Sequence, residues 1–409
     1  MSFATKRIVM SGPLGEDGLH RLLKLLASDG DSAFVVGGAV RNSLISYPVS
    51  DIDIATTVVP EIVIERATAQ GMRAVPTGVA HGTVTVIVDG QSYEVTTLRE
   101  DVQTDGRHAT VRFGTDYAKD AARRDFTMNA LYADASGQVY DYVGGLDDLL
   151  FRRVRFIGDA RTRIKEDYLR ILRFFRFSAD YAQGRLDEEG LAAIDEEKAG
   201  LQHLSSERLR VEMLKLLMAR RAVPVLTVMS HQGIFDLILG LTVNVEALGA
   251  LLEHDPGADA LLRLAAFCVH KADDADVIKE RLRLSNAETD RITQIGKALM
   301  LLSIQSKRLE AKGVRKLAFR LGRRALSDAL AIDGARRGYV VEPSLFEAAG
   351  GAPTLSPFTG EILLKRGLSP GRQIGEIIRR AEEAWMDADF PTEPATLGHI
   401  LHDSIKHLS

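Results

Sequence analysis

The residues best suited to chemistry are two aspartates, Asp51 and Asp53. Their spacing would place both side chains on one face of a strand. Asp51 and Asp53 flank Ile52, so on a strand Asp51-Ile52-Asp53-Ile54 both carboxylates share a face while Ile52 and Ile54 point into the core. Because like charges repel, two aligned carboxylates are costly unless a divalent cation lies between them. The pair therefore indicates a metal site.

A glycine turn lies shortly upstream of this pair. Gly37 and Gly38 follow the apolar run Ala33–Val36 and precede Ala39–Ile45, which predicts a strand, a tight turn and the start of a helix that carries Arg41. Backbone N–H groups of such a turn approach a phosphate closely, and a helix N-terminus favours its negative charge. A phosphate-binding turn beside paired carboxylates indicates nucleotidyl or phosphoryl transfer.

Glu94 is a third candidate carboxylate. It lies on an expected strand, Ser92–Leu98, which pairs through Asp89-Gly90 with another expected strand, Gly82–Val88. In the site it would activate an attacking hydroxyl or orient a metal. A surface glutamate on an alternating strand is the open alternative.

A pair of arginines precedes an acid in the block Arg123–Ala130. A guanidinium grips phosphate oxygens with two parallel hydrogen bonds and does not lose its proton, so Arg124 suits a triphosphate. We expect a helix from Arg124 to Tyr132. On it Asp125 and Asn129 would share a face and either hold a ribose or cap the helix.

A further polar row follows in the segment Arg163–Phe177, whose spacing predicts a helix. Its polar positions recur every three residues, at Asp167, Arg170, Arg173 and Arg176. Asp167 and Arg170, one turn apart, form a rigid acceptor and donor pair. The alternative is an intrahelical ion pair of little energetic value.

Together these blocks resemble a known family. Gly-Gly-x-Val-Arg, D-x-D, R-R-D-F-T-x-N-A and E-D-x-x-R-I-L-R occur in this order, as in the class II tRNA nucleotidyltransferases, which are the CCA-adding enzymes of bacteria and eukaryotes, and the related bacterial poly(A) polymerases. The resemblance is dense from about residue 30 to 185 and looser in the remainder.

The resemblance implies an α+β fold. An N-terminal nucleotidyltransferase head with a mixed or antiparallel sheet and helices would be followed by an elongated all-α neck, body and tail. The expected divisions are a catalytic head at 1–150, a helical neck with base recognition at 151–220, a helical body at 221–340 and a helical tail that contacts tRNA at 341–409. Helical periodicity from Leu146 onward agrees with this division.

The resemblance also implies roles for the site residues. Asp51 and Asp53 would bind two Mg²⁺ ions, and Gly38 and Arg41 would contact nucleotide phosphates. Arg124 would hold the triphosphate or ribose with Asp125 nearby, and Arg173 and Arg176 would support phosphate or base. Asp167 and Arg170 would read the base edge. One departure is Asn42, where many members have Asp.

The chemistry of the bases agrees with the last assignment. Cytosine and adenine each present an amino donor beside a ring-nitrogen acceptor, which match an Asp167 acceptor and an Arg170 donor. Uracil and guanine present the reverse order, and each mismatched buried group costs roughly 1–3 kcal/mol. One protein pair would thus select CTP and ATP without a nucleic-acid template.

The predicted function is template-independent addition of C, C and A to the tRNA 3′ end, by attack of the RNA 3′ hydroxyl on the α-phosphate of CTP or ATP. The segment Leu98–Ala109 resembles the flexible loop that the family needs for the final A, and Leu363–Gly375 resembles the tail of CCA-adding enzymes. A bacterial poly(A) polymerase is the alternative. A non-catalytic RNA-binding protein is a further, remote alternative. Such a protein would be expected to have lost one of four residues that this chain retains, namely Asp51, Asp53, Asp167 and Arg170.

Composition limits the possible classes of protein but does not indicate a function. The chain has 409 residues, a formal net charge of −4 and one cysteine, Cys268, which predicts a buried thiol and excludes a disulfide framework. No apolar stretch is long enough to cross a bilayer, so we expect a cytoplasmic protein without a membrane partner. The basic run Gln305–Tyr339 is a candidate RNA contact, and Trp385 is expected to be a packing anchor.

Overall fold

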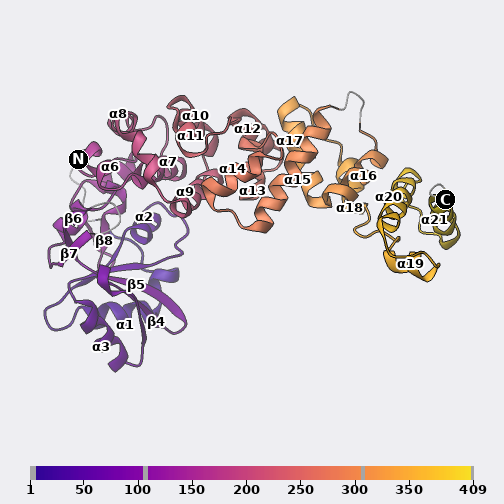
Figure 1. Ribbon diagram of the computed structural model, residues 1–409. Coiled ribbons are helices and arrows are strands. Elements are labelled where there is room, and N and C mark those ends of the chain that lie inside the picture. Colours follow the sequence, from indigo (N-terminus) through magenta and orange to yellow (C-terminus); the bar gives the residue numbers. More distant parts are fainter. Residues whose placement is uncertain (1–5, 105–108, 305–308, 407–409) are drawn as a thin grey trace. The chain divides into compact units, whose positions relative to one another are not determined.

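The structure is a computed structural model that describes residues 6–104, 109–304 and 309–406. Contacts divide the chain into two compact units, Met1–Ile238 and Leu239–Ser409 (Figure 1). Within the described ranges, no helix is both long and apolar enough to cross a membrane.

A mixed seven-stranded sheet forms the centre of the N-terminal part of the first unit. Its strand order is β3-β4-β5-β2-β1-β8-β9, and only the central β2–β5 pairing is parallel. A separate hairpin contains β6 and β7. The strands are β1 (Ala33–Val36), β2 (Asp53–Thr56), β3 (Arg73–Gly78), β4 (Thr83–Val88), β5 (Gln91–Thr97), β6 (Arg99–Thr104), β7 (Ala109–Phe113), β8 (Leu131–Ala133) and β9 (Val139–Asp141).

Five α-helices accompany these strands. They are α1 (Asp17–Leu26), α2 (Gly38–Leu44), α3 (Pro60–Ala69), α4 (Tyr117–Ala122) and α5 (Gly145–Leu150), together with short 3₁₀ turns at Gly12–Gly15, Val79–His81 and Thr127–Asn129. Helix α1 buries one leucine face, and α3 begins with Pro60, whose fixed φ suits the first helical turn. Both helices contact the sheet.

Three local predictions need correction. The strand of the aspartate pair begins at Asp53 rather than Asp51, although the expected alternation of exposed aspartates and buried isoleucines is present. The predicted helix from Arg124 to Tyr132 is wrong, because a 3₁₀ turn and β8 occupy that stretch. Leu131–Ala133 pairs with β1 and β9 in the sheet, and this pairing outweighs the helical spacing of the apolar residues.

The segment expected as a loop also differs. Backbone pairing places Arg99–Thr104 in β6, opposite β7. Residues 105–108 of that prediction lie outside the described ranges.

The rest of the first unit is helical. Its helices are α6 (Ala160–Glu166), α7 (Leu169–Tyr181), α8 (Glu188–Glu197), α9 (Ser206–Met218), α10 (Ala222–His231) and α11 (Ile234–Ile238), with a 3₁₀ segment at Lys198–His203. Helix α7 buries its apolar side, where Phe174 stacks on Phe156 with ring centroids 5.4 Å apart. This packing holds the apolar side of α7 against Phe156, so the arginines of α7 lie on its opposite side.

In its described residues the second unit contains helices and connecting turns but no strand. Its helices are α12 (Val245–His254), α13 (Ala260–Cys268), α14 (Asp274–Leu282), α15 (Asn286–Ser303), α16 (Ala311–Leu321), α17 (Arg323–Arg337), α18 (Pro343–Gly351), α19 (Gly360–Lys365), α20 (Arg372–Asp387) and α21 (Pro394–Lys406). Cys268 is fully buried and Trp385 is 3% exposed, which confirms both packing predictions. The Trp385 Nε1 also donates to the Pro391 carbonyl at 2.8 Å.

Much of the basic run expected to contact RNA has protein partners. On α16, Arg315 pairs with Asp389 at 2.5 Å, and Lys316 and Arg320 pair with Asp387 and Glu383. On α17, Arg336 donates to the Val269 carbonyl at 2.6 Å. These contacts engage several basic side chains of the run within the unit, and RNA contact by this run stays a prediction.

Candidate active site

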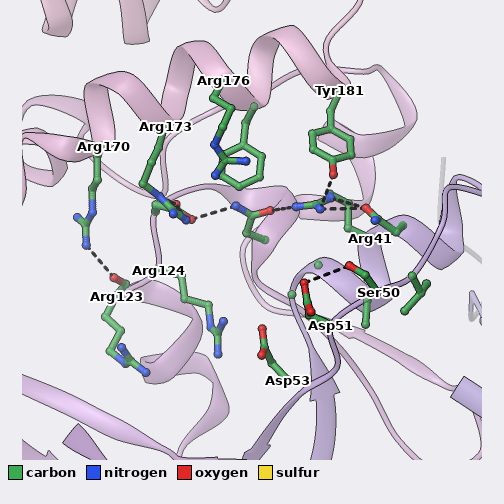
Figure 2. A pocket seen from close by; sticks show the side chains of 18 of the residues that line it. Arg41, Ser50, Asp51, Asp53, Arg123, Arg124, Arg170, Arg173, Arg176 and Tyr181 are labelled. Atoms are coloured by element: carbon green, nitrogen blue, oxygen red, sulfur yellow. Dashed lines mark hydrogen bonds and ion pairs between the residues drawn. The ribbon is translucent and has the colours of Figure 1, made fainter. Parts of the chain in front are cut away.

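One cavity of about 640 Å³ gathers nearly all of the predicted site residues. Its size suits a nucleotide-sized ligand. The lining residues are Gly37, Gly38, Ala39, Arg41, Asn42, Val49, Ser50, Asp51, Asp53, Arg123, Arg124, Asp125, Asn129, Asp167, Arg170, Arg173, Arg176, Phe177 and Tyr181. Figure 2 shows arginines descending from α7 on one side and the aspartate pair on the other.

The carboxylate pair lies at the edge of the cavity where β2 begins. Asp53 lies opposite Glu94 in the parallel β2–β5 register, and Asp51 accepts a hydrogen bond from Ser50 Oγ at 3.1 Å. Desolvation first, and then the charge of Glu94, raise the pKa of Asp53; Arg124 opposes this shift and Asp51 adds to it. Glu94 is exposed and does not line the cavity, so it lies beside the pair rather than within it.

The glycine turn carries the first turn of α2 into the cavity. Gly37 has φ 71° and ψ −121°, a conformation that glycine adopts easily and other residues rarely do. Its N–H donates to the Leu131 carbonyl at 2.9 Å, which ties the turn to β8.

Replacing Gly37 by Ala is expected to strain this turn by roughly 1–3 kcal/mol and to raise KM for the nucleotide. The added Cβ would meet its nearest atom, the Asn129 carbonyl oxygen, at an ordinary 3.5 Å, so the effect comes from backbone strain rather than a clash. Gly90→Ala is the matched control, because Gly90 has φ 86° in open space at the β4–β5 turn. Steady-state kinetics would contradict this role if both variants had the same KM.

A buried aspartate orients the two adjacent arginines. Asp120, which is 1% exposed, binds Arg123 at 2.5 Å and Arg124 at 3.1 Å, and it accepts from the Tyr132 hydroxyl at 2.8 Å. Burial acts to raise the pKa of Asp120, but Arg124 and Arg123 hold it below its usual value. The arginine pair is thus fixed toward the cavity before any ligand arrives.

Asp120→Asn is expected to destabilise the fold by roughly 3 kcal/mol, because it leaves two guanidinium groups without their counter-charge. Since the folded pKa of Asp120 is depressed, its stabilisation is present above the unfolded value of about 4 and is lost as the pH falls through the folded value. Denaturant unfolding at several pH values measures both effects. Asp116→Asn on the same helix is the control, since Asn caps a helix as well as Asp does; equal stabilities of the two variants would refute the expectation.

A chain of hydrogen bonds crosses the cavity from α7 to α2. Arg173 donates to Asp125 at 2.7 Å, Asn129 donates to Asp125 at 3.2 Å, and Arg41 donates to Asn129. Arg41 also donates to the Tyr181 hydroxyl at 2.7 Å (Figure 2). Asp125 and Asn129 therefore meet as predicted, although no helix joins them.

Opposite charges meet at the Asp125 end of this chain, whereas the side chains that accept hydrogen bonds from Arg41 are the neutral Asn42, Asn129 and Tyr181. Burial acts to raise the pKa of Asp125, but the charge and hydrogen bonds of Arg173, with Asn129, hold it below its usual value. Asn42, the departure from the family pattern, accepts from Arg41 at 2.9 Å and donates to the Pro48 carbonyl at 2.7 Å. Asn42 thus helps to fix the Arg41 guanidinium.

The predicted base-reading row is on two elements rather than one. Helix α7 carries Arg170, Arg173 and Arg176. Asp167 is the C-terminal cap of α6, with φ −159° and ψ 105°, and belongs to neither helix. Arg170 donates to Glu166 at 2.6 Å and to the Arg123 carbonyl at 3.3 Å. Arg176 pairs with the buried Glu212 of α9 at 2.5 Å.

Several residues of the site were not predicted. Tyr181 and Phe177 line the cavity with the Arg41 guanidinium 4.0 Å and 5.3 Å from their ring centroids. Asp120 and Glu212 hold the arginines from behind. Phe177 and Tyr181 are four residues apart on the arginine helix, a spacing that the sequence contained; the partners of Asp120 and Glu212 depend on tertiary packing.

Comparison with known proteins defines the class. The family described as "Poly A polymerase head domain" matches residues 33–155, and "Probable RNA and SrmB- binding site of polymerase A" matches residues 185–242. The fold is similar to that of the Bacillus stearothermophilus CCA-adding enzyme in complex with CTP, with a TM-score of 0.74, 24% identity and coverage of 97% of this chain and 99% of that one. The fold and the cavity together belong to a nucleotidyltransferase.

Full-length relatives narrow the class to one family. The mitochondrial CCA tRNA nucleotidyltransferase 1 of Mus musculus is 34% identical over 92% of this chain and 88% of its own length. A CCA-adding enzyme of Lactobacillus delbrueckii subsp. bulgaricus is 31% identical over 93% of this chain and 96% of its own. The chain belongs to the CCA-adding tRNA nucleotidyltransferase family, as its motifs predicted.

Proposed function

We propose that this protein adds C, C and A to the 3′ end of tRNA, using CTP and ATP and no nucleic-acid template. The observation that carries the proposal is the single cavity that brings the carboxylate pair, the glycine turn and the two arginine clusters together with Asp167. Relatives solved with CTP, with ATP and with tRNA support these substrates.

The donor set fits a divalent cation, and we propose two Mg²⁺ ions. Within the described residues no three His, Cys, Asp or Glu side chains form a complete metal cage. Mg²⁺ does not need one, since it commonly takes one or two carboxylates and completes its shell with water and substrate phosphates. Asp51 and Asp53 would hold the metal. Desolvation first, and then the charges of Glu94 and Asp51, raise the pKa of Asp53, and a bound cation would oppose this shift by favouring the charged carboxylate. When bound, such ions supply Lewis-acid stabilisation of charge on the phosphates and on the attacking oxygen.

The remaining roles belong to the side chains. The Gly37–Gly38 turn and Arg41 would hold phosphate, and Arg123 and Arg124, fixed by Asp120, would neutralise the triphosphate. Asp125 and Asn129 would position the ribose or the residues around it. Asp167 would accept from the amino group of cytosine or adenine while Arg170 donates to the ring nitrogen. We propose that Glu94 acts through its neighbour Asp53.

Incubation with tRNA transcripts that end before CCA, after the first C and after the second C tests the proposal. With Mg²⁺, CTP and ATP, we expect each transcript to grow to CCA and stop, as sequencing of the 3′ ends would show. Long A tracts on varied RNAs would instead make the protein a poly(A) polymerase. Arrest at CC would mean that residues 98–109 do not have the predicted role. The cytoplasmic location and tRNA contact by the tail stay predictions.

A further inference from the structure

The two side chains proposed to read the base do not pair with each other. Asp167 and Arg170 are one turn apart, and the Arg170 N–H donates to the Asp167 carbonyl at 3.0 Å. An Asp and an Arg at such spacing commonly form an ion pair. Among the described contacts, the Asp167 carboxylate and the Arg170 guanidinium instead bind other side chains. Those partners keep the two groups apart.

Arg208 of α9 holds the carboxylate. Its Nη2 donates to Asp167 Oδ2 at 2.7 Å, and the Leu169 N–H donates to Asp167 Oδ1 at 3.1 Å. Both oxygens are thereby fixed, and each keeps a lone pair for a ligand, because a carboxylate offers about four acceptor sites. On the other side, Glu166 holds the Arg170 guanidinium at 2.6 Å.

We propose that Arg208 is a positioning residue for nucleotide selection, which keeps the Asp167 carboxylate turned toward the base and away from Arg170. Without Arg208, the Asp167 carboxylate would be free to turn toward Arg170, three residues along the chain. An ion pair between them would occupy the acceptor and the donor that the base requires. This inference rests on the proposed function and assigns a residue outside the cavity lining to it.

The surroundings of Arg208 favour this role over RNA contact. Arg208 lies in the stretch 185–242 that resembles an RNA-binding family, but its guanidinium is committed to Asp167 and its side chain is only 36% exposed. One turn further along α9, Glu212 binds Arg176 at 2.5 Å and approaches Arg173 at 3.7 Å. The same face of α9 therefore meets the nucleotide-facing row with opposite charge at successive positions.

The test measures kcat/KM for CTP and for UTP on a tRNA transcript ending before CCA, and the Kd of that tRNA. Arg208→Gln keeps most of the side-chain length and removes the charge, while Arg208→Lys keeps a charge without the planar fork. Lys215→Ala, an exposed position on the same helix, is the control. We expect Arg208→Gln to lower the CTP/UTP ratio about tenfold with tRNA Kd unchanged, and Arg208→Lys to restore part of the ratio.

Each outcome decides the inference. An Arg208→Gln enzyme with the wild-type ratio, or one that loses only tRNA affinity, overturns it and leaves the proposed function intact. If Arg208→Gln does not fold, a wild-type ratio in Arg208→Lys overturns it and an intermediate ratio supports it. A wild-type enzyme that does not prefer CTP over UTP would refute the proposed base-reading function itself.

Discussion

Asp53→Asn is expected to lower nucleotide addition by roughly a thousandfold or more while tRNA binding changes little. The substitution keeps the shape of the side chain and removes the charge that the cation and the α-phosphate chemistry require, an effect worth several kcal/mol. The raised pKa of Asp53 shows that its charge is already held against desolvation and against Glu94. Asn relieves that repulsion, so the fold should be no less stable than the wild type.

Single-turnover incorporation of CTP measures the rate, and a filter-binding or gel-shift assay measures tRNA affinity. Asp89→Asn is the matched control, since Asp89 is an exposed acid in the same part of the chain whose φ of 53° Asn also tolerates. An Asp53→Asn enzyme that still works at more than a tenth of the wild-type rate would contradict the metal assignment.

Asp167→Asn is expected to lower kcat/KM for CTP and ATP by about 5- to 150-fold while UTP incorporation falls less or rises. An amide presents a donor as well as an acceptor, so it meets the uracil carbonyl without the unpaired contact that the carboxylate imposes, a difference of about 1–3 kcal/mol. The preference for C and A over U and G should therefore narrow.

Competition between CTP and UTP in one reaction, followed by sequencing of the 3′ ends, measures this preference directly. Asp195→Asn serves as the control, because Asp195 is an exposed acid of α8 whose partner is Lys198 at 2.7 Å. A uniform loss for all four nucleotides would show that Asp167 supports the fold of the pocket and does not read the base.

The motifs and the family that they resemble predicted which residues gather in the cavity, and two of these blocks lie where two elements of the sheet region meet. The Gly37–Gly38 turn joins β1 to α2, and Asp51 and Asp53 stand at the entry to β2, so the topology of the sheet brings them to one edge. Apolar periodicity predicted that helices dominate the chain after β9, as they do in its described residues. Relatives and solved structures confirmed the family, while the individual roles of the residues remain for experiment.

What the sequence could not supply is the set of side chains that hold the functional ones. Asp120 binds two arginines that are close to it in sequence. The sequence does not show that Asp120 is buried and that Tyr132 of β8 donates to it. Arg208 and Glu212 lie far along the chain from Asp167 and Arg176, and only helix packing brings them together. The helix predicted at Arg124–Tyr132 failed for a related reason, since pairing with β1 and β9 decides the conformation of Leu131–Ala133.

Competition between nucleotides shows whether one protein pocket selects both CTP and ATP. Binding of labelled CTP to the protein with Mg²⁺ would be challenged with unlabelled ATP, UTP and GTP in the absence of RNA. With one shared pocket, we expect ATP to displace CTP completely and competitively, and UTP and GTP to require at least about tenfold higher concentrations. Simultaneous binding of CTP and ATP, or displacement by UTP as effective as by ATP, would contradict it.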